Sequence, residues 1–105
     1  MSNYPKIRHI LASAFAIDVG LSEIAQRQLL ERFLANEESR TSFQRELLDA
    51  FSDEHTSWTE LLSNAKYEVV EADSEQRARE IAAGLLWEPT FPGQPLPQIE
   101  QEQEK

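Results

Sequence analysis

The chain has 105 residues, of which 40% are hydrophobic and 28% charged, and its net charge is −9. This length fits one domain with a single modest core. There are no cysteines, which excludes disulfides, thiolate metal sites and a cysteine nucleophile. No apolar run approaches the roughly 20 residues of a membrane span. We therefore expect a cytoplasmic protein without a membrane segment.

The N-terminal segment has the spacing of an amphipathic helix. Its apolar residues recur at i, i+3, i+4, i+7 and i+8, at Ile7, Ile10, Leu11, Ala14 and Phe15. Pro5 suits a first helical turn, with Asn3 or Tyr4 as the cap. Polar residues break the apolar stretch at helical spacing, so we expect this helix rather than a signal peptide.

A second helix is expected over residues 22–35, after a boundary at Gly20 and Ser22. Four apolar residues share its inner face: Leu29, Leu30, Phe33 and Leu34. Ile24 lies off this face, so either it contacts a different neighbour or the helix begins later.

Three later segments have the spacing of a capping box, in which two side chains bond reciprocally to the first turn of a helix. They are Thr41–Gln44, Ser57–Glu60 and Asp73–Gln76. Each would open a helix. The helix that follows the Ser57–Glu60 box would begin at Trp58. The inner faces would be formed by Phe43, Leu47, Leu48 and Phe51, by Leu61 and Leu62, and by Ala78, Ile81, Ala82 and Leu85.

Two segments lack a helical pattern. Residues 67–71 contain a β-branched pair that could be extended, although the sequence shows no partner strand. Residues 91–105 hold several prolines and end in a glutamine/glutamate run, which predicts an extended, disordered acidic tail anchored by Trp87 and Phe91. The sequence thus predicts an all-α, compact bundle of about four to five helices in residues 1–90, followed by this tail.

The negative charge is concentrated in one part of the chain. Residues 1–45 have a net charge of +1, whereas residues 46–73 hold eight acids and one base, for a net charge of −7. Such a segment predicts a negative patch that would speed encounter with a basic partner. Direct binding of nucleic acid is disfavoured, because phosphate contacts need lysine and arginine.

The sequence offers little for catalysis. His9 is expected on the polar side of the first helix, and His55 follows two acids without a second histidine to complete a metal site. The three glycines lie far apart, so no phosphate-binding loop is present, and no serine sits in a nucleophile motif. We expect no enzyme activity, no metal and no cofactor.

Two aromatic residues lie within or beside the acidic segment. Trp58 is interpreted as a core anchor in the first turn of its helix, although an aromatic ring flanked by charge can also be the centre of a protein interface. For Tyr67, whose neighbours Glu68 and Glu71 are acidic, a core position and an interface position are about equally favoured.

Residues 4–88 resemble the small helical immunity proteins of bacterial contact-dependent growth inhibition systems. The resemblance is carried by YPKIRHILASAFAID, by the Trp-x-x-Leu-Leu of SWTELL and by Tyr67 before the last helix. It implies binding and neutralisation of a cognate toxin domain, without catalysis or a cofactor. Where such families have His-Gln between the aromatic residue and Asp18, this chain has Ala16 and Ile17.

We therefore expect a monomer that binds a basic toxin domain, of the nuclease type, in a 1:1 complex. The expected contact residues are Glu46, Asp49, Asp53, Glu54, Trp58, Tyr67, Glu68, Glu71 and Asp73. Inhibition would occlude the active site or the substrate path. Two alternatives remain: a DNA mimic that inhibits a DNA-binding protein, and a non-catalytic accessory or adaptor subunit.

Overall fold

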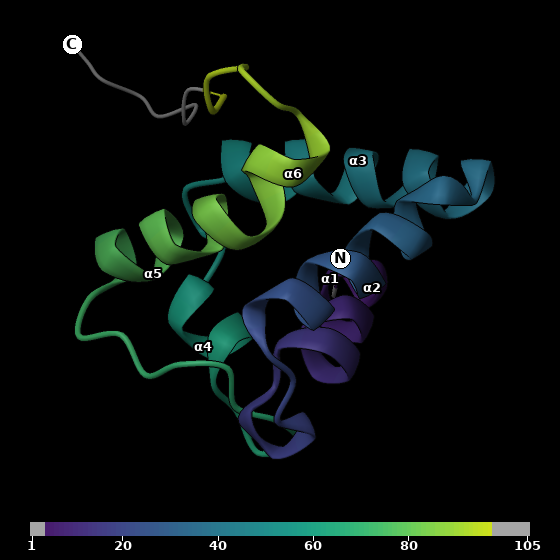
Figure 1. The fold of residues 1–105 in the computed structure, drawn as a ribbon. Coiled ribbons are helices and arrows are strands. Elements are labelled where there is room, and N and C mark those ends of the chain that lie inside the picture. The colour runs from purple at the N-terminus through teal and green to yellow at the C-terminus, as the bar shows by residue number, and fades with distance from the viewer. Residues whose placement is uncertain (1–3, 98–105) are drawn as a thin grey trace, which may run out of the picture.

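The computed structural model describes residues 4–97, which fold into packed helices and connecting loops (Figure 1). The elements follow one another in chain order as α1 (Pro5–Ile10), the π-helical turn η1 (Leu11–Phe15), the 3₁₀ turn η2 (Ile17–Val19), α2 (Glu23–Ala35), α3 (Glu37–Ser52), α4 (Trp58–Leu62), α5 (Glu75–Ala82), the π-helical turn η3 (Ala83–Trp87) and α6 (Glu88–Thr90). Since α5, η3 and α6 run on without a break, the described residues form five helices and contain no strand. The all-α prediction is confirmed.

The core is centred on Phe51, which is fully buried at the end of α3. The ring of Trp58 stacks on it with centroids 4.4 Å apart, and Trp87 meets it edge-on at 5.6 Å. The apolar stripe predicted for the first helix is buried along its whole length. Burial of these aromatic and aliphatic side chains is the main force that holds α1, α3, α4 and α5 together.

Helix α1 is capped by a side chain from another helix. Tyr4 precedes it with φ 53°, a left-handed conformation that is strained for a tyrosine, and provides no side-chain cap. Instead, Glu46 of α3 accepts hydrogen bonds from the backbone N–H groups of Lys6 and Ile7, at 2.9 and 3.0 Å. A carboxylate at a helix N-terminus satisfies unpaired donors and complements the helix dipole. Glu46 therefore joins α3 to α1.

Helix α2 begins where the sequence predicts, whereas α3 begins earlier than predicted. Ser22 caps α2 by accepting from the N–H of Ala25, as the predicted boundary requires. The expected start of α3 at Thr41 is wrong, because Asn36 caps the helix by accepting from the N–H of Ser39 and the helix is continuous from Glu37. Asparagine is as good a cap as threonine, so the earlier signal prevails.

The short helix α4 begins where its capping residue predicts, with Ser57 Oγ accepting from the N–H of Glu60. The segment after it then doubles back. Ser63 and Glu68 form an antiparallel bridge, and Val69 N–H donates to the carbonyl of Leu62 at 2.7 Å. The partner that the sequence does not reveal for this extended segment is the end of α4 itself.

Helix α5 begins one residue later than its predicted capping box. Ser74, not Asp73, is the cap, and its Oγ accepts from the N–H of Arg77 at 3.1 Å. The segment after α6 is anchored by Trp87, whose indole N–H donates to the carbonyl of Gln94 and whose ring packs on Phe91 with centroids 4.3 Å apart. The predicted disorder of residues 98–105 lies outside the described residues.

None of the helices in residues 4–97 is long and apolar enough to cross a membrane.

Candidate functional site

The nine residues predicted to contact a partner lie in three different environments. Trp58 is only 2% exposed, so its ring belongs to the core and offers no surface. Glu46 is half-buried and its carboxylate is occupied by the cap of α1. Tyr67 is half-buried against the core, whereas the remaining six acids are exposed.

The exposed acids occur on two loops and the helix end that precedes them. Asp49 lies in the last turns of α3, and Asp53 and Glu54 lie in the loop between α3 and α4. Glu68, Glu71 and Asp73 lie in the loop between α4 and α5. We call these six residues the acidic surface. In Figure 1 the α3–α4 loop leads into the upper end of α4, whereas the α4–α5 loop starts at the lower end of α4, beside η2, and runs up to the start of α5.

Glu75, which sequence reasoning missed, connects these two loops. It is the first residue of α5, and its carboxylate accepts from the backbone N–H of Trp58 at 2.7 Å and from the Ser57 hydroxyl at 2.9 Å. Burial alone would raise the pKa of this carboxyl, but the hydrogen bonds from Thr59, Ser57 and Trp58 bring the pKa below its ordinary value. The loop that holds Asp53 is thereby fixed beside the loop that ends at Asp73.

A groove of about 380 Å³ follows this junction. Asp53, Glu54 and Glu75 line it together with Arg79. Arg79 is committed to the fold, since its guanidinium donates to the carbonyls of Phe51 and Pro97 at 2.9 and 3.2 Å and lies 5.4 Å from the centre of the Phe51 ring. Burial lowers its pKa. The two acids of the α3–α4 loop thus line a groove, and Arg79, the one cation among its lining residues, is engaged by backbone carbonyls.

Few of the carboxylates of the acidic surface are neutralised by basic side chains of the described residues. Within residues 4–97, five of its six acids form no ion pair, and Glu54 pairs only with His55, at 3.6 Å. The side chain of His55 is 85% exposed, and this pair carries attraction only when the histidine is protonated. Arginine and lysine side chains of the described chain therefore do not cover this surface.

A second polar hollow lies around Tyr67. Arg8 of α1 forms an ion pair with Glu60 of α4 at 2.8 Å, and both line this hollow of about 580 Å³ with Tyr67. The Tyr67 hydroxyl is buried; burial raises the pKa of the tyrosine, whereas the nearby charge of Arg8 opposes that rise. Glu60 belongs to the acidic segment 46–73, but its carboxylate pairs with Arg8 and so joins α4 to α1.

The described residues do not assemble a recognisable reaction centre. His9 is exposed on α1 near the Phe33 ring, far along the chain from the exposed His55. No group of three or more metal-binding side chains is found in residues 4–97.

Comparison of the chain with protein-family models, with curated proteins and with solved structures gave no match.

Proposed function

We propose that this protein is an immunity protein, which binds and neutralises a cognate antibacterial toxin domain with a basic surface. The observation that carries the proposal is the acidic surface: six exposed carboxylates at the end of α3 and on the two loops that flank α4, five of which form no ion pair within residues 4–97. Unneutralised charge of one sign raises the association rate with an oppositely charged protein and disfavours the wrong partners.

The way in which the loops are fixed supports the same role. Glu75 ties the start of α4 to the start of α5, so the carboxylates on either side are held on a fixed scaffold rather than on free segments. A preorganised surface loses less conformational entropy on binding, which favours affinity. The proposal favours a nuclease toxin as the partner, because a protein that binds nucleic-acid phosphates presents a basic surface.

Trp58 and Glu46 are not part of the proposed contact. The ring of Trp58 is covered by Phe51 and the carboxylate of Glu46 by α1. The energetic centre of the interface is instead assigned to Asp53 and Glu54, which line one groove, so that a basic side chain of the toxin would meet two carboxylates at once. No catalytic step and no cofactor enter this mechanism.

A growth-protection experiment tests the proposal. A candidate toxin domain, sought among the products of neighbouring genes, is co-expressed with the wild type or with a variant that reverses four acids to lysine: Asp49, Glu54, Glu71 and Asp73. The matched control reverses four exposed acids on other surfaces: Glu37, Glu38, Glu80 and Glu88. Both variants change the net charge equally.

We expect the control to protect cells and the acidic-surface variant to lose protection, with circular dichroism showing both variants folded. Full protection by both variants would refute the electrostatic mechanism. Binding to many unrelated DNA-binding proteins, with competition by DNA, would instead identify a DNA mimic. A constitutive complex with a larger cellular protein would identify an accessory subunit.

A further inference from the structure

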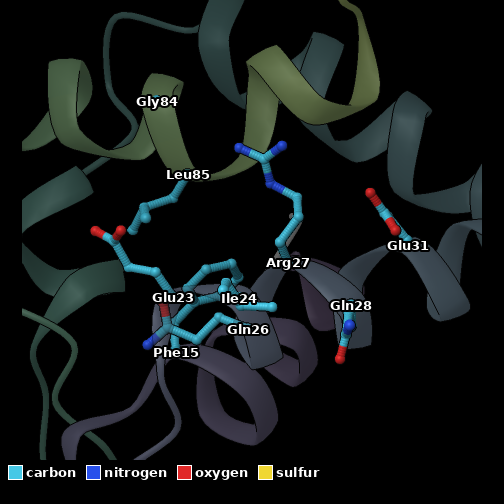
Figure 2. Close-up of a pocket in the computed structure, with 9 residues that line it drawn as sticks. All are labelled: Phe15, Glu23, Ile24, Gln26, Arg27, Gln28, Glu31, Gly84 and Leu85. Carbon is cyan, nitrogen blue, oxygen red and sulfur yellow. The ribbon is translucent and has the colours of Figure 1, made fainter.

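The N-terminal half of α2 forms one wall of a groove that the acidic surface does not share. The groove has a volume of about 550 Å³ and lies between α2 and η3. Figure 2 shows the side chains of Glu23 and Arg27 extending toward Gly84 and Leu85, with Ile24 between them. Both π-helical turns of the described chain contribute, through Phe15 of η1 and Gly84 and Leu85 of η3.

Most of the exposed large apolar side chains of the described residues lie in the part of the chain that leads into α2. Four large apolar side chains are exposed in residues 4–97, and three of them, Ile17, Val19 and Ile24, fall within eight residues of one another. Ile24 is 72% exposed, although the sequence led us to expect a neighbour for it or a later start of the helix. Neither holds, because α2 begins at Glu23 and Ile24 points outward.

The charged residues that flank Ile24 are exposed, as Ile24 is, and form no ion pairs within residues 4–97. Glu23, Arg27 and Glu31 follow one another at i, i+4 and i+8, so they form a row of alternating charge along one side of α2. All three are exposed, and none forms an ion pair within residues 4–97, even though the spacing permits it. An exposed apolar side chain flanked by unpaired charges of both signs is compatible with an antiparallel helix pair, in which flanking charges set partner choice and orientation.

We propose that this face of α2 binds a second copy of the chain, so that two molecules associate through an antiparallel pair of α2 helices about a two-fold axis. If the axis passes beside Ala25, Glu23 of each copy lies opposite Arg27 of the other, which closes two equivalent ion pairs. Ile24 then packs against Ile24 of the second copy over the mouth of the groove. A two-fold contact is self-complementary, and the order of charges on α2 meets that condition.

Gly84 leaves the opposite wall of the groove open. A Cβ atom added there would meet no atom within 4 Å, so the chain itself does not require glycine at this helical position. The absence of a side chain lets the second copy approach η3. The association departs from the monomer that sequence reasoning predicts. The acidic residues lie on α3 and on the loops that flank α4, whereas the proposed contact is formed by α2 and η3.

Sedimentation velocity of the full chain tests the proposal between about 5 and about 500 µM, a range that brackets weak self-association. We expect the wild type to shift from monomer to dimer and Ile24→Glu to remain monomeric. Leu48→Glu, which charges an exposed leucine on α3, is the control and should dimerise like the wild type. A wild type that stays monomeric throughout, or an Ile24→Glu variant that still dimerises, overturns the proposal.

A charge exchange tests the two-fold geometry and controls for misfolding. Glu23→Arg and Arg27→Glu should each weaken self-association on the order of tenfold, because like charges then face each other twice. Mixed in equal amounts, the two variants should form a heterodimer, since each then presents the charge that the other lacks. The double variant should again dimerise alone. Failure of both the mixture and the double variant to dimerise overturns the proposed register.

Discussion

The carboxylate of Glu75 accepts a hydrogen bond from the backbone N–H of Trp58 at 2.7 Å, so the first residue of α5 caps the first turn of α4. Glu46 does the same for α1 from its place on α3. In this small protein, two carboxylates that a charge count assigns to the surface are tertiary contacts between helices. Which acids remain available to a partner is decided by these two contacts.

The Glu75 contact should make a measurable contribution to stability. Replacing Glu75 by glutamine removes the charge while nearly preserving size, and we expect the free energy of unfolding to fall by about 1–2 kcal/mol, as for loss of a charged helix cap. Urea denaturation at pH 7 measures this change. Glu80→Gln, on the exposed side of the same helix, is the control and should change stability by less than about 0.5 kcal/mol.

The same residue should contribute to acid sensitivity. Hydrogen bonds hold the folded-state pKa of Glu75 below its ordinary value of 4.5. Its contribution is therefore fully present above the unfolded-state pKa and is lost as the pH falls through the folded-state pKa. We expect the stability difference between wild type and Glu75→Gln to shrink as the pH is lowered from 7 to about 3. A difference that stays constant over this range would contradict the assignment.

Glu46 should behave as a structural residue despite its position in the acidic segment. Glu46→Ala leaves the N–H groups of Lys6 and Ile7 without their acceptor, and we expect a loss of about 1–2 kcal/mol. Asp49→Ala, three residues later on the exposed side of α3, should cost less than about 0.5 kcal/mol. Chemical denaturation of the two variants distinguishes the roles; equal losses would show that the cap of α1 is not important.

Gly84→Ala should stabilise the isolated chain. Gly84 lies within the helical run from Glu75 to Thr90, and an added Cβ would meet no atom within 4 Å. Alanine exceeds glycine in helix propensity by about 1 kcal/mol, so the melting temperature should rise by several degrees. Differential scanning calorimetry at low protein concentration measures the effect without self-association. A lower melting temperature would mean that η3 requires the conformational freedom of glycine.

Much of the fold could be predicted from the sequence because its helices carry strong local signals. The stripe from Ile7 to Phe15 follows the helical period, and Ser22 and Ser57 cap helices where their spacing requires. The prediction was wrong at Leu48, which was expected on the inner face of its helix but is 46% exposed, and where two capping residues compete within a few positions. Asn36 prevails over Thr41 and Ser74 over Asp73, and the capping preferences of these residue types are too similar to predict which one is used.

The candidate site was less accessible to sequence reasoning. The charge count locates the acidic segment, but it cannot tell that Glu46 caps α1 or that Glu60 pairs with Arg8, because these partners lie 40 and 52 residues away in the chain. The charge count also misses Glu75, because this residue lies just beyond the acidic segment 46–73. The exposure of Ile24 had a visible signal, its position off the apolar face of α2.

The salt dependence of toxin association tests the central claim most directly. Stopped-flow measurements with the cognate toxin domain would compare wild type with the variant in which Asp49, Glu54, Glu71 and Asp73 are changed to lysine. Electrostatic steering predicts that the wild-type association rate constant falls by about tenfold or more between about 20 and about 300 mM salt, and that the variant associates slowly with little salt dependence. Equal, salt-independent rate constants for the two proteins would contradict the account.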